Sequence, residues 1–351
     1  MAMSTSDVRK APHRRRSPRI AATLALLTVA AVGGCSPSPD SDKPAYATEF
    51  KPAYDPNGPK GTYLGQQKYA TTDEVLAAVA AAQETQTLSD AAAAHLVELS
   101  RPHQDGPEEC FGKRETNVTT DDTQLGECAY GDPKGTKQMV IFGDSRAPMW
   151  ASTLERVAAI TGWQVRLFAR GGCPPPDLDY QSNETHAPDP QCNTFHRAAV
   201  DEIRKLRPQL VVTAGNSHTL ASGENPTSSQ WQDALASTLQ ELALPGTRVA
   251  VLGPLPTWDS NDAKCVSAHT RDVQACSTER TNAVPKYFDA EREAAATAGA
   301  VYVDTVPWVC AEKCEPVISD IVVYYDPWHF TKKYADYLSG AVAEALRPAM
   351  T

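Results

Sequence analysis

The strongest constraint on the fold is an alternation of short apolar runs and longer amphipathic stretches between residues 138 and 346. The apolar runs are predicted strands, at 138–142, 164–169, 209–213, 248–252 and 300–304. The amphipathic stretches are predicted helices, at 148–160, 194–206, 230–242, 283–298 and 332–346. Apolar strands separated by helices favour a parallel sheet that is covered on both faces. The pattern therefore predicts a three-layer α/β/α fold with a five-stranded parallel sheet of the flavodoxin-like kind.

The chain before this alternation divides into further parts. Residues 66–137 predict a helical extension followed by a disulfide loop, because apolar residues recur at helical spacing over 72–82 and 88–100. Thr71 and Glu74 have the spacing of a capping box for the first of these helices. The segment 35–65 is rich in Ser, Pro, Asp and Lys and predicts a disordered tether. The main domain is thus expected at 138–351.

Residues 1–34 have the features of an export signal. Six Lys and Arg residues precede an apolar run of 13 residues at 20–32, which is too short to span a bilayer. Val32, Gly33 and Gly34 stand directly before Cys35, an arrangement similar to the site at which bacterial lipoproteins are lipidated. An ordinary secretory signal with an incidental cysteine is the alternative. We therefore expect an exported protein, lipid-anchored at Cys35 on the outer face of a bacterial cell membrane, or else secreted.

The charge of the chain excludes some partners. Without the first 34 residues there remain 27 basic and 42 acidic residues, a formal charge near −15. Such a body is repelled by nucleic acid and by anionic lipid head groups. No nucleic-acid partner is expected, and membrane contact is expected through the lipid anchor only.

Cysteine usage supports export. Beyond Cys35 the chain has eight cysteines, an even number, at 110, 128, 173, 192, 265, 276, 310 and 314. An even count in an exported chain favours disulfides, although eight cysteines permit 105 connectivities. The simplest prediction pairs neighbours in sequence: Cys110–Cys128, Cys173–Cys192, Cys265–Cys276 and Cys310–Cys314. A zinc site is the alternative, but no CxxC occurs and no histidine stands at ligand spacing beside two cysteines. No metal and no cofactor is expected.

Gly143-Asp144-Ser145 stands directly after the first predicted strand and just before a helix. In a parallel sheet the reactive groups gather beyond the carboxyl ends of the strands. A serine in this place has its hydroxyl near backbone N–H groups that can support an oxyanion. The alternative interpretation is a plain helix cap, because Asp and Ser are favoured capping residues.

Asp326-Pro327-Trp328-His329 stands just before the last predicted helix. An Asp and a His three residues apart can meet on one side of a turn, where the carboxylate holds the imidazole in the tautomer that accepts a serine proton. Taken alone, the motif would favour a surface turn with a capping Asp. Its place at the far end of the chain from Ser145, where a doubly wound sheet returns to its active edge, favours a catalytic pair.

Two further loops carry candidate oxyanion donors. Asn216 follows the third predicted strand and can direct an amide N–H at a developing oxyanion. Gly171 and Gly172 follow the second strand, where a backbone N–H could serve in the same way. A glycine pair followed by prolines is also simply a turn.

Taken together, these blocks resemble the SGNH (GDSL-like) hydrolase superfamily. The closer likeness is to the SGNH domain at the C-terminus of membrane acyltransferases that O-acylate cell-surface polysaccharides, and it covers roughly residues 66–348. The motifs that carry it are, in order, Cys110, Cys128-Ala-Tyr-Gly-Asp132, Gly143-Asp-Ser-Arg-Ala147 with Trp150, Cys173-Pro-Pro175, Cys192, Gly253-Pro-Leu-Pro256, Cys265, Cys276, Tyr302-Val-Asp304, Cys310, Cys314 and Asp326-Pro-Trp-His329.

The resemblance implies a role for each matching residue. Ser145 would be the nucleophile, His329 its base and Asp326 the acid that orients His329. The oxyanion donors would be the Ser145 N–H, a glycine N–H at 171 or 172, and Asn216. Two positions depart from the family pattern: Arg146 replaces the usual histidine after the serine, and Ala214-Gly-Asn-Ser217 lacks the first glycine and the aspartate of its block.

Five residues are candidate substrate contacts: Arg146, Trp150, Arg170, His218 and Trp328. The arginines could meet an anionic or sugar substrate, with structural salt bridges as the alternative. The tryptophans could form a wall on which a sugar stacks, with core packing as the alternative. His218 could be no more than a neighbour of Asn216.

The function expected from this pattern is ping-pong acyl transfer, through an acyl-enzyme on Ser145, to a cell-envelope glycan. No run of about 20 apolar residues occurs, so the acyl group would come from an extracytoplasmic donor or a separate membrane acyltransferase. One alternative is an esterase that removes acyl groups from envelope glycans with the same triad. Another is a non-catalytic lipoprotein that binds glycans or a membrane acyltransferase.

Overall fold

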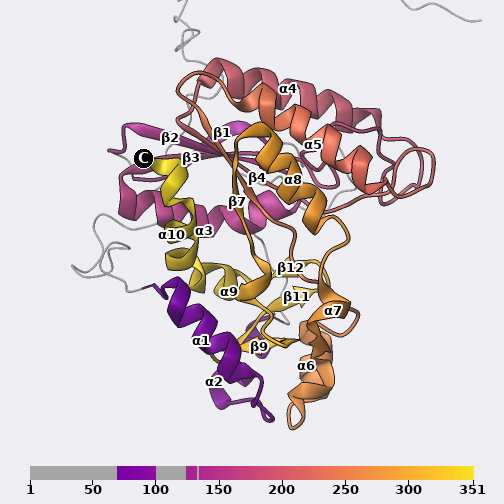
Figure 1. Ribbon diagram of the computed structural model, residues 1–351. Helices are drawn as coiled ribbons and strands as arrows, with labels where there is room; N and C mark the ends of the chain where they lie inside the picture. Colours follow the sequence, from indigo (N-terminus) through magenta and orange to yellow (C-terminus); the bar gives the residue numbers. More distant parts are fainter. Residues whose placement is uncertain (1–68, 100–123, 133) are drawn as a thin grey trace, which may run out of the picture. The chain divides into compact units, whose positions relative to one another are not determined.

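A six-stranded mixed sheet forms the centre of the fold in the computed structural model, with the strand order β1-β3-β2-β4-β5-β7 (Figure 1). The strands are β1 Gln124–Gly131, β2 Lys137–Gly143, β3 Trp163–Ala169, β4 Leu210–Ala214, β5 Arg248–Leu252 and β7 Val301–Val303. The structure describes residues 69–99, 124–132 and 134–351, all of which belong to one compact unit, Lys43–Thr351. The predicted signal peptide 1–34, Cys35, the tether 35–65 and Cys110 lie outside the described residues.

The sheet contains one strand more than predicted. β2, β3, β4, β5 and β7 run parallel, as expected, whereas β1 pairs antiparallel with β3 at one edge. The sequence of β1, QLGECAYG, contains two glycines and a glutamate, and its register shifts between Leu125 and Ala129. A bulged strand lacks the regular apolar alternation by which strands are recognised. The sheet therefore begins within the segment 66–137 and not at residue 138.

Helices cover both faces of the sheet and form the two outer layers of the predicted α/β/α fold. α3 Arg146–Thr161 and α10 Ser339–Met350 pack on one face, and α4 Pro190–Leu206, α5 Ser228–Leu242 and α8 Phe288–Ala298 pack on the other (Figure 1). Because successive side chains of a strand point to opposite faces, Ile141 joins the core under α3 and Phe142 joins the core under α4 and α5.

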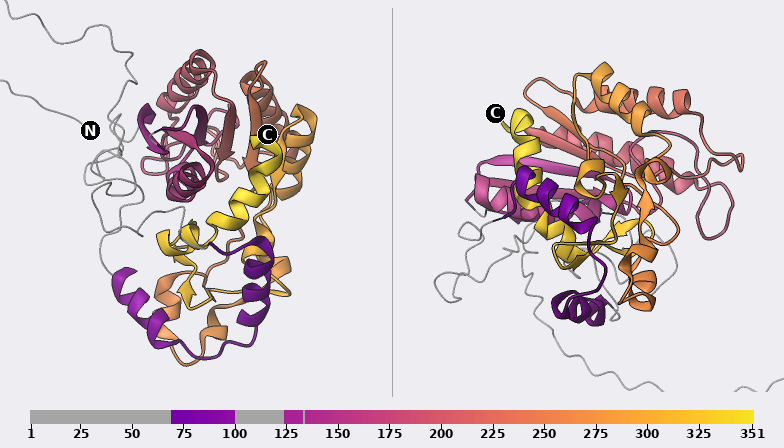
Figure 2. Two further views of the ribbon diagram at one scale, coloured as in Figure 1. Left: turned by 90° about the vertical axis from the view of Figure 1, so that its left-hand side faces the viewer. Right: turned by 60° about the horizontal axis from the view of Figure 1, so that its bottom comes forward.

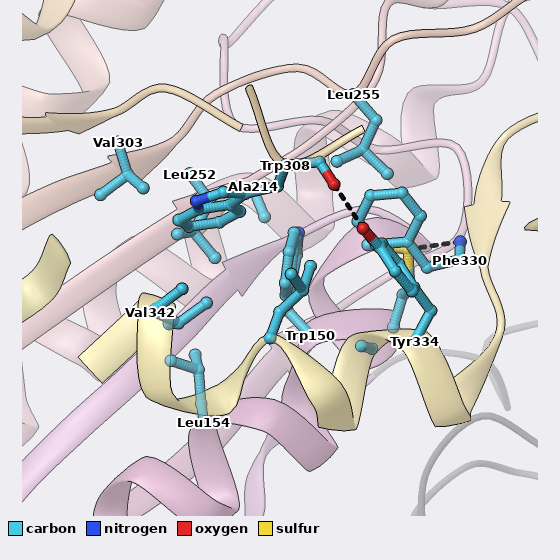
Figure 3. Close-up of a cluster of buried hydrophobic side chains, with 14 of the residues drawn as sticks. Trp150, Leu154, Ala214, Leu252, Leu255, Val303, Trp308, Phe330, Tyr334 and Val342 are labelled. Atoms are coloured by element: carbon cyan, nitrogen blue, oxygen red, sulfur yellow. Dashed lines mark hydrogen bonds between the residues drawn. The ribbon is translucent and has the colours of Figure 1, made fainter. Parts of the chain in front are cut away.

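One cluster of aromatic side chains joins the end of the chain to α3. The rings of Trp150 and Phe330 meet nearly edge-on, with centroids 5.5 Å apart. The Tyr334 hydroxyl donates a hydrogen bond to the Trp308 carbonyl, and the Phe330 N–H donates to the Met149 sulfur (Figure 3). This packing fixes the residue that follows His329 against the helix that follows Ser145.

Two predicted helices differ in extent in the structure. The predicted helix 283–298 begins only at Phe288, as α8, and Ala283 instead ends a separate short helix, α7 Arg280–Ala283. Pro285 lies between the two, and proline cannot continue the hydrogen-bond ladder of a helix. The stretch 332–346 forms α9 Lys332–Tyr337 and α10, which extends to Met350. At that break the Ser339 hydroxyl donates to the Asp336 carbonyl, 2.7 Å away, and competes with the helical bonds of the backbone.

The N-terminal extension contains α1 Thr72–Ala82 and α2 Asp90–Leu99, and the predicted capping box of Thr71 and Glu74 is present. The Glu344 carboxylate of α10 accepts hydrogen bonds from the backbone N–H and hydroxyl of Thr72. Figure 2 shows both helices beside the orange segment around residues 260–280. The remaining short elements are α6 Ala263–Ala268, η3 Val273–Cys276, β6 Thr278–Glu279, η4 Val306–Trp308, β8 Lys313–Cys314, β9 Val317–Ile318, β10 Ile321–Val322, β11 Tyr324–Asp326 and β12 His329–Phe330.

Three of the four predicted disulfides are present: Cys173–Cys192, Cys265–Cys276 and Cys310–Cys314. The predicted pair Cys110–Cys128 rests on Cys110 and on the Cys128 side chain, which lie outside the described part of the chain. Disulfides are characteristic of oxidising compartments, so they indicate an extracytoplasmic location. Within the ranges that the structure describes, no helix combines the length and the apolar character needed to cross a membrane.

Candidate active site

The loop that carries Ser145 joins β2 directly to α3. A Cβ atom at Gly143 would lie 1.7 Å from the Ala214 carbonyl oxygen, so only glycine lets the ends of β2 and β4 approach this closely. Ser145 occupies the N-cap position of α3, yet its hydroxyl makes no capping hydrogen bond. It is half-buried and lies 2.8 Å from the Nε2 atom of His329.

Asp326 and His329 face each other across the short hairpin formed by β11 and β12. The imidazole Nδ1 lies 2.9 Å from each carboxylate oxygen of Asp326. An ionised carboxylate can only accept, so Nδ1 carries the proton and Nε2 is left to accept the hydrogen bond of the Ser145 hydroxyl. The ring of Tyr325 stacks on the imidazole, 5.5 Å away between centroids. The structure thus brings the three residues together as one hydrogen-bonded chain.

The Asp326 carboxylate is held in its ionised form. Burial alone would raise its pKa, but hydrogen bonds from the His329 imidazole and from the backbone N–H groups of Trp328 and His329 outweigh burial and lower the pKa. An ionised Asp326 stabilises a proton on His329 when the imidazole takes one from serine.

Asp144 is a residue whose importance sequence reasoning missed. Its fully buried carboxylate accepts hydrogen bonds from the backbone N–H of Arg146, from the backbone N–H of Asn216 and from Nε2 of His218, at 2.8, 2.8 and 3.0 Å. Burial would raise its pKa, but the hydrogen bond and charge of His218, together with the two backbone donors, lower it. Asp144 therefore ties the loop of Ser145 to the loop of Asn216.

The glycine loop after β3 is also fastened to the serine loop. The Arg170 N–H donates to the Gly143 carbonyl at 3.2 Å, which places this loop beside the end of β2. Gly171 has open space where a side chain would be, and Gly172 has a φ of +75°, which favours glycine. The loops that carry Ser145, the glycine pair and Asn216 thus lie together beyond the strand ends. The oxyanion roles of Gly171, Gly172 and Asn216 stay predictions.

Of the five candidate substrate contacts, three are buried. Arg146 and Trp150 are buried in the first turns of α3, where Trp150 is part of the core. Arg170 is buried in a salt bridge with Asp189, 2.9 Å long. For Trp150 and Arg170 the structure shows the core packing and the salt bridge that were the alternatives, and the substrate contacts of all three side chains stay predictions.

The other two candidates differ from each other. His218 is mostly buried and is held by Asp144, with Nδ1 facing the side-chain amide of Asn183 at 3.3 Å. Trp328, by contrast, leaves 53% of its surface exposed immediately before His329. Trp328 is thus the candidate contact that solvent reaches.

Arg146 is unusual because its guanidinium is buried without a hydrogen-bond partner among the described residues. Burial lowers its pKa, while the charges of Asp144, Tyr324 and Glu291 act in the opposite direction. Glu291 accepts a hydrogen bond from Nε1 of Trp231 at 3.1 Å, and burial raises its pKa to about 8. Within the described ranges, no three His, Cys, Asp or Glu side chains are grouped so that they could hold a metal ion.

Comparison with known proteins identifies the family of this chain. A family model described as "SGNH domain (fused to AT3 domains)" matches residues 109–344, which confirms the resemblance noted from the motifs. No curated protein matches the chain. Among solved structures, the periplasmic domain of a lipopolysaccharide acetyltransferase from Salmonella ser. Paratyphi A is similar, with a TM-score of 0.48 and 18% identity over 61% of this chain and 85% of that chain.

Proposed function

We propose that this chain, which belongs to the SGNH domain family of the kind fused to AT3 domains, is a serine-dependent O-acyltransferase. The observation that carries the proposal is the hydrogen-bonded chain from Asp326 through His329 to Ser145. It joins residues 184 positions apart in sequence and ends in a hydroxyl that solvent partly reaches. Nucleophilic catalysis needs this order of an orienting acid, a base and a nucleophile.

In the first half-reaction, Ser145 would attack the carbonyl carbon of an ester or thioester donor. The hydroxyl proton moves to Nε2 of His329 as the Oγ–carbon bond forms, and the carbonyl oxygen becomes an oxyanion. The Ser145 N–H, a glycine N–H at 171 or 172 and the Asn216 amide are the proposed donors to that oxyanion. When the tetrahedral intermediate collapses, the leaving group departs with the proton of His329, and the acyl group stays on Ser145.

In the second half-reaction, a hydroxyl of the acceptor would take the acyl group. His329 accepts the proton of that hydroxyl as its oxygen attacks the acyl carbon, and it returns a proton to Oγ as Ser145 leaves. If the acceptor is a glycan hydroxyl, the product is an O-acyl glycan; if it is water, the reaction is hydrolysis. We propose a glycan of the cell envelope, and an anchor at Cys35 would hold the enzyme beside it.

The proposal is tested by intact-protein mass spectrometry of the full-length chain after exposure to 4-nitrophenyl acetate. We expect one added acetyl group in the wild type and none in the Ser145→Ala variant. If the wild type gains no acetyl group, or if the variant gains one as readily, the nucleophile proposal fails and a binding role becomes the better explanation. With methyl glycosides added, acetyl-sugar product supports transfer, whereas acetate release that ignores the sugar supports an esterase.

A further inference from the structure

Trp328 differs from the other tryptophans of the chain. Four of the six are buried in the core, and Trp258 is half-buried, with its Nε1–H bonded to the Cys276 carbonyl. Trp328 alone is more than half exposed, at 53%. An exposed indole forgoes a large hydrophobic stabilisation. Trp328 directly precedes His329, the residue that meets the Ser145 hydroxyl.

The backbone that presents this indole is held from two sides. The Trp328 N–H donates to the Asp326 carboxylate at 2.8 Å, the same carboxylate that orients His329. On the other side, the carbonyl of Pro327 accepts a hydrogen bond of 3.1 Å from the side-chain amide of Asn261, which is fully buried. A side chain on a fixed turn loses little backbone entropy when a ligand binds. The backbone of Trp328 is therefore fixed directly beside that of His329.

The charged residues expected to meet a substrate do not offer a free charge beside Trp328. Arg146 is buried to 98% of its surface, Arg170 is paired with Asp189, and His218 is bound to Asp144. An anionic sugar, such as a uronic acid, would find none of these three side chains available for its carboxylate. An uncharged ring needs only an apolar surface and hydrogen bonds.

We propose that Trp328 is the platform on which an uncharged sugar ring of the acyl acceptor stacks. The C–H face of a pyranose would lie on the indole, and a ring hydroxyl would then point towards the Nε2 of His329 that is to accept its proton. This inference rests on the proposed acyl transfer and names the class of its acceptor. Trp328 would act in the second half-reaction, because a small acyl donor need not reach it.

Binding tests the platform without requiring turnover. The full-length Ser145→Ala protein is titrated with uncharged methyl glycosides of glucose, galactose, mannose and N-acetylglucosamine, and with methyl glucuronide, by isothermal titration calorimetry and indole NMR. We expect at least one uncharged glycoside to bind and to shift the Trp328 indole signal. Trp328→Ala in the same background should weaken that binding about tenfold, the scale of an aromatic stacking contact. Trp328→Tyr should restore most of the binding. Ile160→Ala is the control and should leave glycoside binding unchanged, because it alters an exposed apolar side chain roughly 22 Å along α3 from Ser145.

Turnover gives a second test. With 4-nitrophenyl acetate as donor, the ratio of acetyl-sugar to free acetate should fall about tenfold in Trp328→Ala and largely recover in Trp328→Tyr. The platform would be overturned if Trp328→Ala left glycoside binding unchanged in the Ser145→Ala background and left the product ratio unchanged in the otherwise wild-type enzyme. Binding confined to the glucuronide would also overturn it. Failure of Ser145 to become acetylated would overturn the proposed function instead, while the glycoside titrations would still decide whether Trp328 binds sugar.

Discussion

Two Asp–His pairs lie at the same edge of the sheet, and their surroundings differ. In both, a carboxylate holds an imidazole at about 3 Å: Asp326 holds His329 through Nδ1, and Asp144 holds His218 through Nε2. The Asp326 side chain is 32% exposed, and the other ring nitrogen of His329 meets the Ser145 hydroxyl. The Asp144 side chain, by contrast, is fully buried, and the other ring nitrogen of His218 meets Asn183. The same pair of groups can thus serve proton transfer in one place and loop attachment in the other.

The difference shows that the third partner, rather than the Asp–His contact itself, decides what such a pair can do. A hydroxyl at Nε2 supplies a proton that can be moved, while an amide at Nδ1 supplies only a hydrogen bond. Both carboxylates have lowered pKa values, so ionisation does not distinguish them. Substitutions in the two pairs should therefore differ in their effects on the acylation rate and on the free energy of unfolding.

The largest effect is expected for His329→Gln. Glutamine keeps a polar side chain of similar reach but cannot take the proton of Ser145, so acylation by 4-nitrophenyl acetate should slow by about 10⁶-fold, as for the base of other serine triads. The melting temperature should change little. His218→Gln is the matched control, and it should lower the acylation rate by no more than about tenfold. Equal losses in the two variants would contradict the assignment of His329 as the base.

Asp326→Asn should have the next largest effect. The amide can still accept the backbone N–H bonds of the turn, but it no longer stabilises a protonated imidazole and favours the wrong tautomer, so the acylation rate should fall about 10⁴-fold. The free energy of unfolding should fall by about 1 kcal/mol or less, because the side chain is one-third exposed. Stopped-flow acylation and urea unfolding measure both quantities. A loss of rate below tenfold would show that Asp326 does not orient the base.

Asp144→Asn should reverse this balance between rate and stability. The buried carboxylate accepts from three donors, and an amide replaces one acceptor by an N–H group that would face a donor. We expect a loss of about 3 kcal/mol in the free energy of unfolding, the usual cost of breaking a buried charged pair, and a rate loss of about 10- to 100-fold as the loops of Ser145 and Asn216 loosen. A variant with wild-type stability would show that Asp144 does not fasten these loops.

Most of the sheet and the pair of Ser145 and His329 could be predicted from sequence, because both rest on local signals. Apolar runs mark the parallel strands, and GDS and DxxH stand at strand and helix ends. The edge strand β1 escaped prediction because glycines and a bulge hide its alternation. Asp144 escaped because two of its partners, Asn216 and His218, are more than 70 residues away. Arg146 was expected at the site mouth because it adjoins Ser145, but the first turn of α3 directs its side chain inwards.

The smallest effect on the acylation rate is expected at Glu291, a buried carboxylate that has no histidine partner among the residues that the structure describes. Like Asp144 it is buried, yet its pKa rises to about 8 because burial is opposed by little more than the Trp231 N–H and the charge of Arg146. Because of the raised pKa, the folded state keeps a proton on Glu291 that the unfolded state releases above about pH 4.5. The contribution of Glu291 to the free energy of unfolding is therefore complete below pH 4.5 and is lost as the pH rises towards 8.

Glu291→Gln should remove this dependence on pH. Relative to the wild type, the variant should gain stability between pH 4.5 and 8, by at most on the order of 5 kcal/mol, with acylation at pH 7 nearly unchanged. The difference between the two proteins is the quantity to measure by urea unfolding at several pH values, because Glu155, whose pKa burial raises to about 7, adds a similar slope to both. If the difference does not change with pH, Glu291 is ionised in the folded protein and pairs with Arg146. The edge of the sheet would then hold an ion pair beside the two Asp–His hydrogen bonds.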